Sequence, residues 1–202
     1  MSKFRPYYLR MSRVGAILVV CTGNVCRSPY IERLLAAEVA ELGVEVSSAG
    51  TMALADQPME EGSARLLADA GVDAGGFAAR QLMRAMVQQA DLVLTATREH
   101  RSQVVRTAPR GLRYTFALDD FSDLVADAEL SDAAPSESPD DTAVTRMVAR
   151  ALVRRADVAP RHADDSGIVD PFRQGPQVFD QMAQQVAAVL PSIVAALRQM
   201  RT

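Results

Sequence analysis

Two cysteines and an arginine occur within one short stretch, VVCTGNVCRSPY, which runs from Val19 to Tyr30. Cys21 follows an apolar run and stands six residues before Arg27, a C-x5-R spacing. Gly23 and Asn24 both tolerate left-handed backbone angles, so the loop can curl with its N–H groups directed inward. We therefore expect a cradle for a tetrahedral oxyanion, built by Thr22, Gly23, Asn24, Val25, Cys26, Arg27 and Ser28.

Cys21 is the candidate nucleophile of this loop. It would face several N–H dipoles, a helix N-terminus and the guanidinium of Arg27, all of which favour a thiolate over a thiol. C-x5-R alone is more often a packed cysteine followed by an unrelated arginine. The apolar strand before the loop, the helix after it and a second motif far along the chain favour the catalytic interpretation.

That second motif is VDPF, in which Pro171 favours an extended backbone at Asp170. A thiolate that attacks phosphorus must expel an alkoxide or phenoxide, which leaves more easily when a carboxylic acid protonates it. We expect Asp170 to be that acid, although an Asp-Pro pair alone indicates only a turn.

The elements around these motifs predict a three-layer α/β fold, with a central four-stranded parallel twisted sheet and helices on both faces. Continuous apolar runs predict strands, and apolar spacing with caps predicts helices. Ligands bind beyond the carboxyl ends of parallel strands, where the cradle follows the first one. Strands are expected over 15–20, 44–50, 91–95 and 113–118, and helices over 29–43, 58–71, 80–90, 98–108, 142–156 and 176–200.

One domain is expected over 14–202, with residues 1–13 as a loose extension, Met11 as an alternative start, and an inserted linker and helix over about 122–167. The acidic stretch 126–141 lacks large apolar residues, so we predict that it is mobile. The helix after it could cover the site or dock a partner, but surface decoration is the simpler interpretation.

Composition narrows the function classes. The 202 residues are 49% hydrophobic and 23% charged, with a net charge of -3 and with lysine and arginine scattered along the chain. We therefore expect neither nucleic acid nor a membrane as partner. Two cysteines are no disulfide framework, which favours a reducing, cytoplasmic location. His100 and His162 match no ligand spacing, so neither a metal nor another cofactor is expected.

C-x5-R-S near the start and Asp-Pro-aromatic near the end make the chain similar to the low-molecular-weight protein tyrosine phosphatases. The resemblance implies a cytoplasmic bacterial hydrolase that forms a phosphocysteine at Cys21, binds phosphate through Arg27 and uses Asp170 as acid and then base. It also implies a phosphotyrosine protein as substrate, phosphate or other oxyanions as inhibitors, and a monomer or weak dimer.

Further positions follow the same family pattern. Ser48 stands where the family bonds a serine to the loop asparagine, and Ser28 where a serine stabilises the thiolate. Leu54 and Phe172 would wall the substrate pocket. Phe77 replaces a histidine found in many members, which predicts an altered hydrogen-bond network.

Two questions stay open in the sequence. Cys26 could trap an oxidised Cys21 as a disulfide or could simply pack, and the two are equally weighted. Val25 stands where related arginine phosphatases carry threonine, whereas Thr22 belongs to a CTGN opening shared with arginine phosphatases and arsenate reductases. Those reductases need a further cysteine pair that this chain lacks. A phosphate-binding module without turnover is the remaining alternative, and Cys21 and Asp170 argue against it.

Overall fold

The computed structural model describes residues 15–126, 141–162 and 166–200, so the expected extension 1–13 and most of the acidic stretch 126–141 lie outside it. The elements follow in the order β1 (Ala16–Cys21), α1 (Arg27–Glu38), β2 (Glu45–Gly50), α2 (Glu61–Asp69), α3 (Arg84–Gln89), β3 (Leu92–Thr95), α4 (Arg98–Thr107), β4 (Thr115–Ala117), α5 (Leu118–Val125), α6 (Ala143–Arg154) and α7 (Pro176–Gln199), with 3-10 turns at Ala40–Leu42 and Pro109–Arg113.

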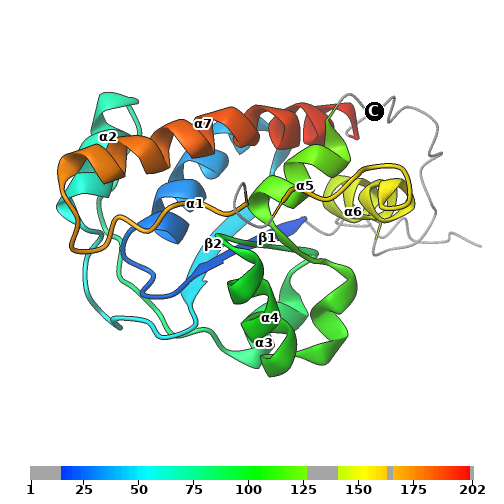
Figure 1. Ribbon diagram of the computed structural model, residues 1–202, viewed down its shortest axis with the longest axis horizontal. Helices are drawn as coiled ribbons and strands as arrows, with labels where there is room; N and C mark the ends of the chain where they lie inside the picture. The colour runs from blue at the N-terminus through cyan, green and yellow to red at the C-terminus, as the bar shows by residue number, and fades with distance from the viewer. Residues whose placement is uncertain (1–14, 127–140, 163–165, 201–202) are drawn as a thin grey trace, which may run out of the picture.

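The four strands form one parallel sheet in the order β2-β1-β3-β4, which confirms the predicted fold class. Side chains alternate between the two faces of a strand. Ile17 and Val19 of β1 accordingly pack into the core beneath α1 and α7, while Leu18 and Val20 pack with residues of α3 and α4. Figure 1 shows α1 and α7 above the sheet and α3 and α4 below it, so helices cover both faces.

The prediction was wrong at two places in the chain. Residues 80–90 were expected to be helical throughout, but α3 begins only at Arg84. The N–H of Gly50 donates to the carbonyl of Arg80 and the N–H of Leu82 donates to that of Gly50, which holds these residues extended beside β2. Residue 118 was expected to end a strand, but Leu118 begins α5, a helix that the sequence interpretation missed.

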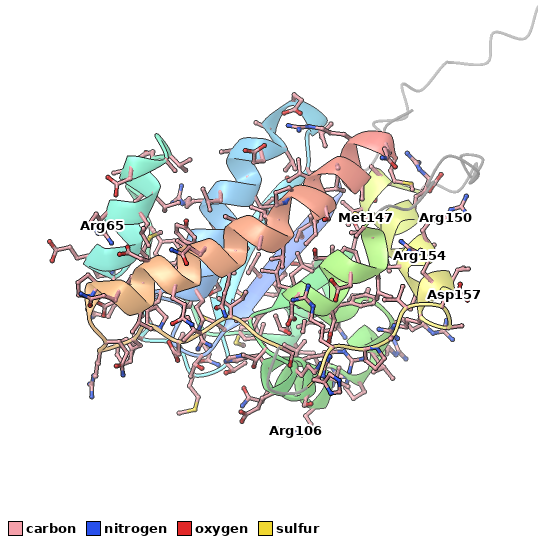
Figure 2. All side chains as sticks on the ribbon, turned by 45° about the horizontal axis from the view of Figure 1, so that its top comes forward. Arg65, Arg106, Met147, Arg150, Arg154 and Asp157 are labelled. Carbon is pink, nitrogen blue, oxygen red and sulfur yellow. The ribbon has the colours of Figure 1, made fainter. Side chains whose placement is uncertain are left out.

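The helix expected over 142–156 is present as α6, and it is part of the core. The Thr142 side chain caps its first turn, and its apolar face packs against α5, α7 and β3. Its buried residues are Val144, Met147, Val148 and Ala151. Arg154 donates to the carbonyl of Leu124 over 3.1 Å and so ties α6 to the end of α5. Figure 2 shows Met147 on the side of α6 that faces α7.

No described helix is both long enough and apolar enough to cross a bilayer. The longest one, α7, buries one stripe that includes Phe179, Met182, Val186 and Ile193, and exposes polar residues on its other side. It therefore behaves as an ordinary amphipathic surface helix.

Candidate active site

The loop between β1 and α1 is anchored from outside through its carbonyl groups. Asn24 has φ 56°, a left-handed conformation that reverses the chain direction at the centre of the loop. With the carbonyls bonded outward, the loop N–H groups lie toward the cavity. The carbonyls of Cys21, Thr22, Gly23 and Val25 accept hydrogen bonds from the N–H groups of Thr51, Met52, Leu54 and Glu60, over 2.9, 3.0, 2.9 and 2.9 Å.

The loop encloses a cavity of about 130 Å³ beyond the carboxyl end of β1. The structure brings most of the predicted site residues to its wall, although Asp170 and Phe172 come from a segment more than 140 residues away, and Asn24, Ser28 and Ser48 are not part of the wall. Met52 also lines it and was not among the expected residues. The lining residues are Cys21, Thr22, Gly23, Val25, Cys26, Arg27, Met52, Leu54, Asp170 and Phe172.

A chain of hydrogen bonds beneath the cavity begins at Cys21. The Ser28 hydroxyl lies 3.0 Å from Cys21 Sγ and accepts a hydrogen bond of 2.9 Å from Asn24 Nδ2, so its own proton is available to the sulfur. The second amide proton of Asn24 goes to Ser48 Oγ over 2.8 Å. Ser48 in turn donates to Glu32 over 2.5 Å. These partners hold Asn24, and with it Ser28 and Cys21, in one orientation.

Phe77 is the residue that predicted an altered hydrogen-bond network, and other groups complete that network. Asn24 Oδ1 accepts from the N–H of Arg80 over 2.8 Å, and Ser48 has the carboxylate of Glu32. Phe77 is partly buried against the main core. Sequence reasoning missed Glu32, although it lies four residues after Ser28 on α1 and therefore on the same helix face.

We expect Asn24→Ala to lower the free energy of unfolding by about 2–4 kcal/mol, because it removes three buried hydrogen bonds and strains a left-handed residue. Asn24→Gly is the matched control, since glycine loses the same bonds without the backbone strain and should be the more stable of the two by about 1 kcal/mol. Urea unfolding of both variants measures this. Equal stabilities would show that backbone strain does not matter at this position.

Arg27 and Asp170 form an ion pair across the mouth of the cavity. Arg27 Nη2 donates to Asp170 Oδ2 over 2.6 Å, and Nη1 donates to the carbonyl of Ile168 over 3.2 Å. The arginine side chain is 5% exposed and that of Asp170 is 49% exposed. Within the described residues, Arg27 Nε is buried without a hydrogen-bond partner. The pair therefore holds the carboxylate above the loop, and the Nε–H of Arg27 stays available to an oxyanion.

Apolar side chains surround this mouth. Leu54 and Met52 are 41% and 72% exposed, and Phe172 is half-buried. The N–H of Phe172 donates to Asp170 Oδ1 over 3.2 Å, which couples the position of the ring to that of the carboxylate. The guanidinium of Arg173 lies 5.1 Å from the centre of the Phe172 ring.

His100 supports the loop from α4, a role that the sequence interpretation missed. Its Nε2 lies 2.8 Å from Thr22 Oγ1 and its Nδ1 lies 2.7 Å from Thr97 Oγ1. Burial, reinforced by the positive charge of Arg27, lowers the pKa of His100 from 6.5 to about 4. The ring is therefore neutral at pH 7. Among the described residues no group of three His, Cys, Asp or Glu side chains could hold a metal, and His162 is exposed.

The lowered pKa of His100 predicts a loss of stability in mild acid. The unfolded chain takes up a proton near pH 6.5 and the folded chain only near pH 4. The stabilisation that comes from keeping His100 neutral is therefore complete above pH 6.5. Up to about 3 kcal/mol of it is lost as the pH falls from 6.5 to 4. We expect His100→Gln, which does not titrate, to show a flatter decline of unfolding free energy over this range. Parallel declines in urea titrations would contradict the assignment.

Cys26 is the second thiol at the cavity. Burial, with the nearby Glu60 and Cys21 adding to it, raises the pKa of Cys26 to about 12. Its thiol is therefore neutral at pH 7, and the structure records both cysteines as free.

Comparison with known proteins matches residues 16–156 to the model of the family described as low molecular weight phosphotyrosine protein phosphatase. Low molecular weight protein-tyrosine-phosphatase Etp of Escherichia coli (strain K12) is 43% identical over 97 residues, which is 48% of this chain and 64% of Etp. The aligned part is thus less than two thirds of that relative.

Solved structures have the same fold. The tyrosine phosphatase Wzb of Escherichia coli K30, in complex with sulphate, gives a TM-score of 0.64 at 24% identity over 91% of this chain and 98% of Wzb. The YwlE arginine phosphatase of Geobacillus stearothermophilus gives a TM-score of 0.65 at 25% identity over 91% of this chain and 93% of that one.

Proposed function

Because the chain belongs to the low molecular weight phosphotyrosine protein phosphatase family, we propose that it is a protein-tyrosine phosphatase that works through a phosphocysteine. The observation that carries the proposal is the single cavity shared by Cys21, the loop, Arg27 and Asp170. A binding module needs a cradle and an arginine, but it needs neither a cysteine on the cavity floor nor an acid above it.

The first half of the reaction transfers the phosphoryl group to sulfur. The loop N–H groups and Arg27 hold the phosphate oxygens, and the buried Nε of Arg27 gains a partner among them. The thiolate of Cys21 attacks phosphorus and the bond to the tyrosine oxygen breaks, while Asp170 donates its proton to that oxygen. Ser28 holds the sulfur in position through its 3.0 Å contact.

The second half releases inorganic phosphate. A water attacks the phosphocysteine, Asp170 takes the proton from that water, and the sulfur leaves as thiolate. Asp170 lies at the exposed side of the cavity, where water reaches it. Phosphate and similar oxyanions are the expected competitive inhibitors, which the sulphate complex of the related Wzb supports.

The residues at the mouth favour an aryl ester. A phosphotyrosine ring entering the cavity would pass between Phe172 on one side and Leu54 and Met52 on the other, and apolar walls favour a ring over a short alcohol. Val25, which also lines the cavity, lacks the hydroxyl that the arginine phosphatases of this family carry there. We therefore assign phosphotyrosine in a cytoplasmic protein as the substrate and phosphoarginine as the alternative.

Initial rates on phosphotyrosine, phosphoarginine and phosphoserine peptides test this assignment. Phosphotyrosine should have the highest kcat/KM, with phosphoserine negligible. Preference for phosphoarginine would mean that Val25 does not decide the substrate, and Val25→Thr then shows whether a hydroxyl there raises that activity further. Phosphate binding without turnover of any peptide would make the protein a binding module.

We further propose that Cys26 protects Cys21 from irreversible oxidation. Peroxide oxidises Cys21 to a sulfenic acid, and the Cys26 thiol attacks that sulfur and releases water to form a disulfide. The closure should be slow because Cys26 is a neutral thiol at pH 7. Dithiothreitol should restore activity to peroxide-treated wild type but not to Cys26→Ala. Equal recovery of both would leave Cys26 with a packing role.

A further inference from the structure

A second cavity of about 380 Å³ lies apart from the catalytic loop and shares no lining residue with it. Its walls come from α4, from β4 and α5, and from the segment 155–161 that follows α6. Arg154 and Asp157, labelled in Figure 2, mark the end of α6 beside this segment. The segment that follows the helix of the predicted insertion thus helps to build a pocket on the core fold.

Four arginines line this pocket, and two of them are neutralised by carboxylates. Arg98 donates to both oxygens of Asp120 over 2.8 and 2.6 Å. Arg161 donates to both oxygens of Asp123 over 2.6 Å each. Each of these two pairs is neutral as a whole and adds no net charge to the pocket.

The other two arginines, Arg101 and Arg155, have no carboxylate within 4.0 Å among the residues that the structure describes. Arg101 Nε donates to the carbonyl of Thr115 over 2.8 Å, an uncharged partner. The guanidinium of Arg155 stacks on the Phe116 ring, 4.5 Å from its centre. Burial and the positive charge of Arg101 lower the pKa of Arg155, and the negative charge of Asp120 offsets this only in part.

We infer that this pocket binds a small phosphomonoester, with its dianionic phosphate between Arg101 and Arg155. A planar guanidinium holds two oxygens of a phosphate at once, and two such groups match its charge. Leu124, Val158 and Pro160 supply apolar wall for a compact carbon body. Small-molecule sites commonly measure roughly 300–1,000 Å³, and this pocket is within that range. The inference does not depend on the proposed phosphatase activity.

Calorimetric titration with phenylphosphonate, which the protein cannot hydrolyse, tests the inference. The pH is kept high enough for the probe to be a dianion. The parent protein carries Arg27→Ala to remove binding at the catalytic loop, and wild type alkylated at Cys21 by iodoacetate serves as a second parent without a substitution. Both parents should still bind one equivalent of the probe.

Adding Arg155→Ser to either parent should weaken this binding by about tenfold or more. Arg155 is an exposed residue whose guanidinium lies over the Phe116 ring, so its loss should leave the fold intact. Arg106→Ser is the control with the same change in charge, on the same helix as Arg101 but distant from α6 in Figure 2. It should not alter the affinity.

Three outcomes would overturn the inference. The first is that neither parent binds the probe, because all binding then belongs to the catalytic loop. The second is that Arg155→Ser binds the probe as tightly as its parent. The third is that Arg106→Ser weakens binding as much as Arg155→Ser does, because only the overall charge then matters.

Discussion

Cys21→Ser is expected to reduce kcat on a phosphotyrosine peptide by roughly 10⁴-fold or more, because a serine hydroxyl in this loop is a far weaker nucleophile than a thiolate. The cradle and Arg27 are unchanged, so phosphate should bind the variant about as well as wild type. Initial rates give the first quantity, and inhibition or calorimetry with phosphate gives the second.

Cys26→Ser is the matched control, with the same atoms exchanged in the same loop and at similar burial. It should keep most of the activity under reducing conditions. Mass spectrometry of acid-quenched turnover mixtures should find a phosphoryl group on Cys21 in wild type. Turnover by Cys21→Ser near the wild-type rate would exclude the phosphocysteine.

Asp170→Asn is expected to lower kcat by roughly 10²–10⁴-fold on phenyl phosphate, whose leaving group needs protonation. On 4-nitrophenyl phosphate the loss should be much smaller, since nitrophenolate leaves without an acid. Asparagine keeps an oxygen that can accept the 2.6 Å hydrogen bond from Arg27, so the geometry of the pair survives while the proton is lost. The ratio of the two losses in kcat separates the effect of the missing proton from any effect on the position of Arg27.

The control for this pair of substrates is Asp180→Asn on α7. Asp180 accepts a 2.7 Å hydrogen bond from Arg65 at the surface and does not line the cavity, so the same chemical change should leave both rates unaltered. If Asp170→Asn slows both esters equally, Asp170 positions Arg27 rather than donating a proton, and another group must be the acid.

The phosphate loop could be predicted because its determinants are local. An apolar strand, a loop with Gly23 and Asn24, and a helix beginning beside Pro29 follow one another within a few residues, and strand, turn and helix preferences act over that range. The same reasoning predicted the strands and most helices. It missed α5, because LDDFSDLV is short and directly follows β4, so its helical spacing is hidden at the end of an apolar run.

The partners of the loop required the tertiary structure. His100 and Thr22 are 78 residues apart and Arg27 and Asp170 are 143 apart. Their proximity depends on how α4 and the segment before α7 dock on the sheet, and packing of whole elements is not encoded in local spacing. Phe77 suggested an altered network, but only the folded chain shows that Glu32 and the Arg80 N–H complete it.

Charge gives the clearest contrast between what the sequence determines and what the tertiary structure determines. Along the sequence the arginines are scattered and the net charge is -3, so neither nucleic acid nor a membrane was expected as partner. Folding places the residues that follow α6 beside α4, and Arg101 and Arg155 then share one pocket. The sequence by itself determined the fold class and the chemistry of the loop, because both depend on local order. Tertiary structure decided which distant charges meet, because electrostatic interactions depend on distance in space and not along the chain.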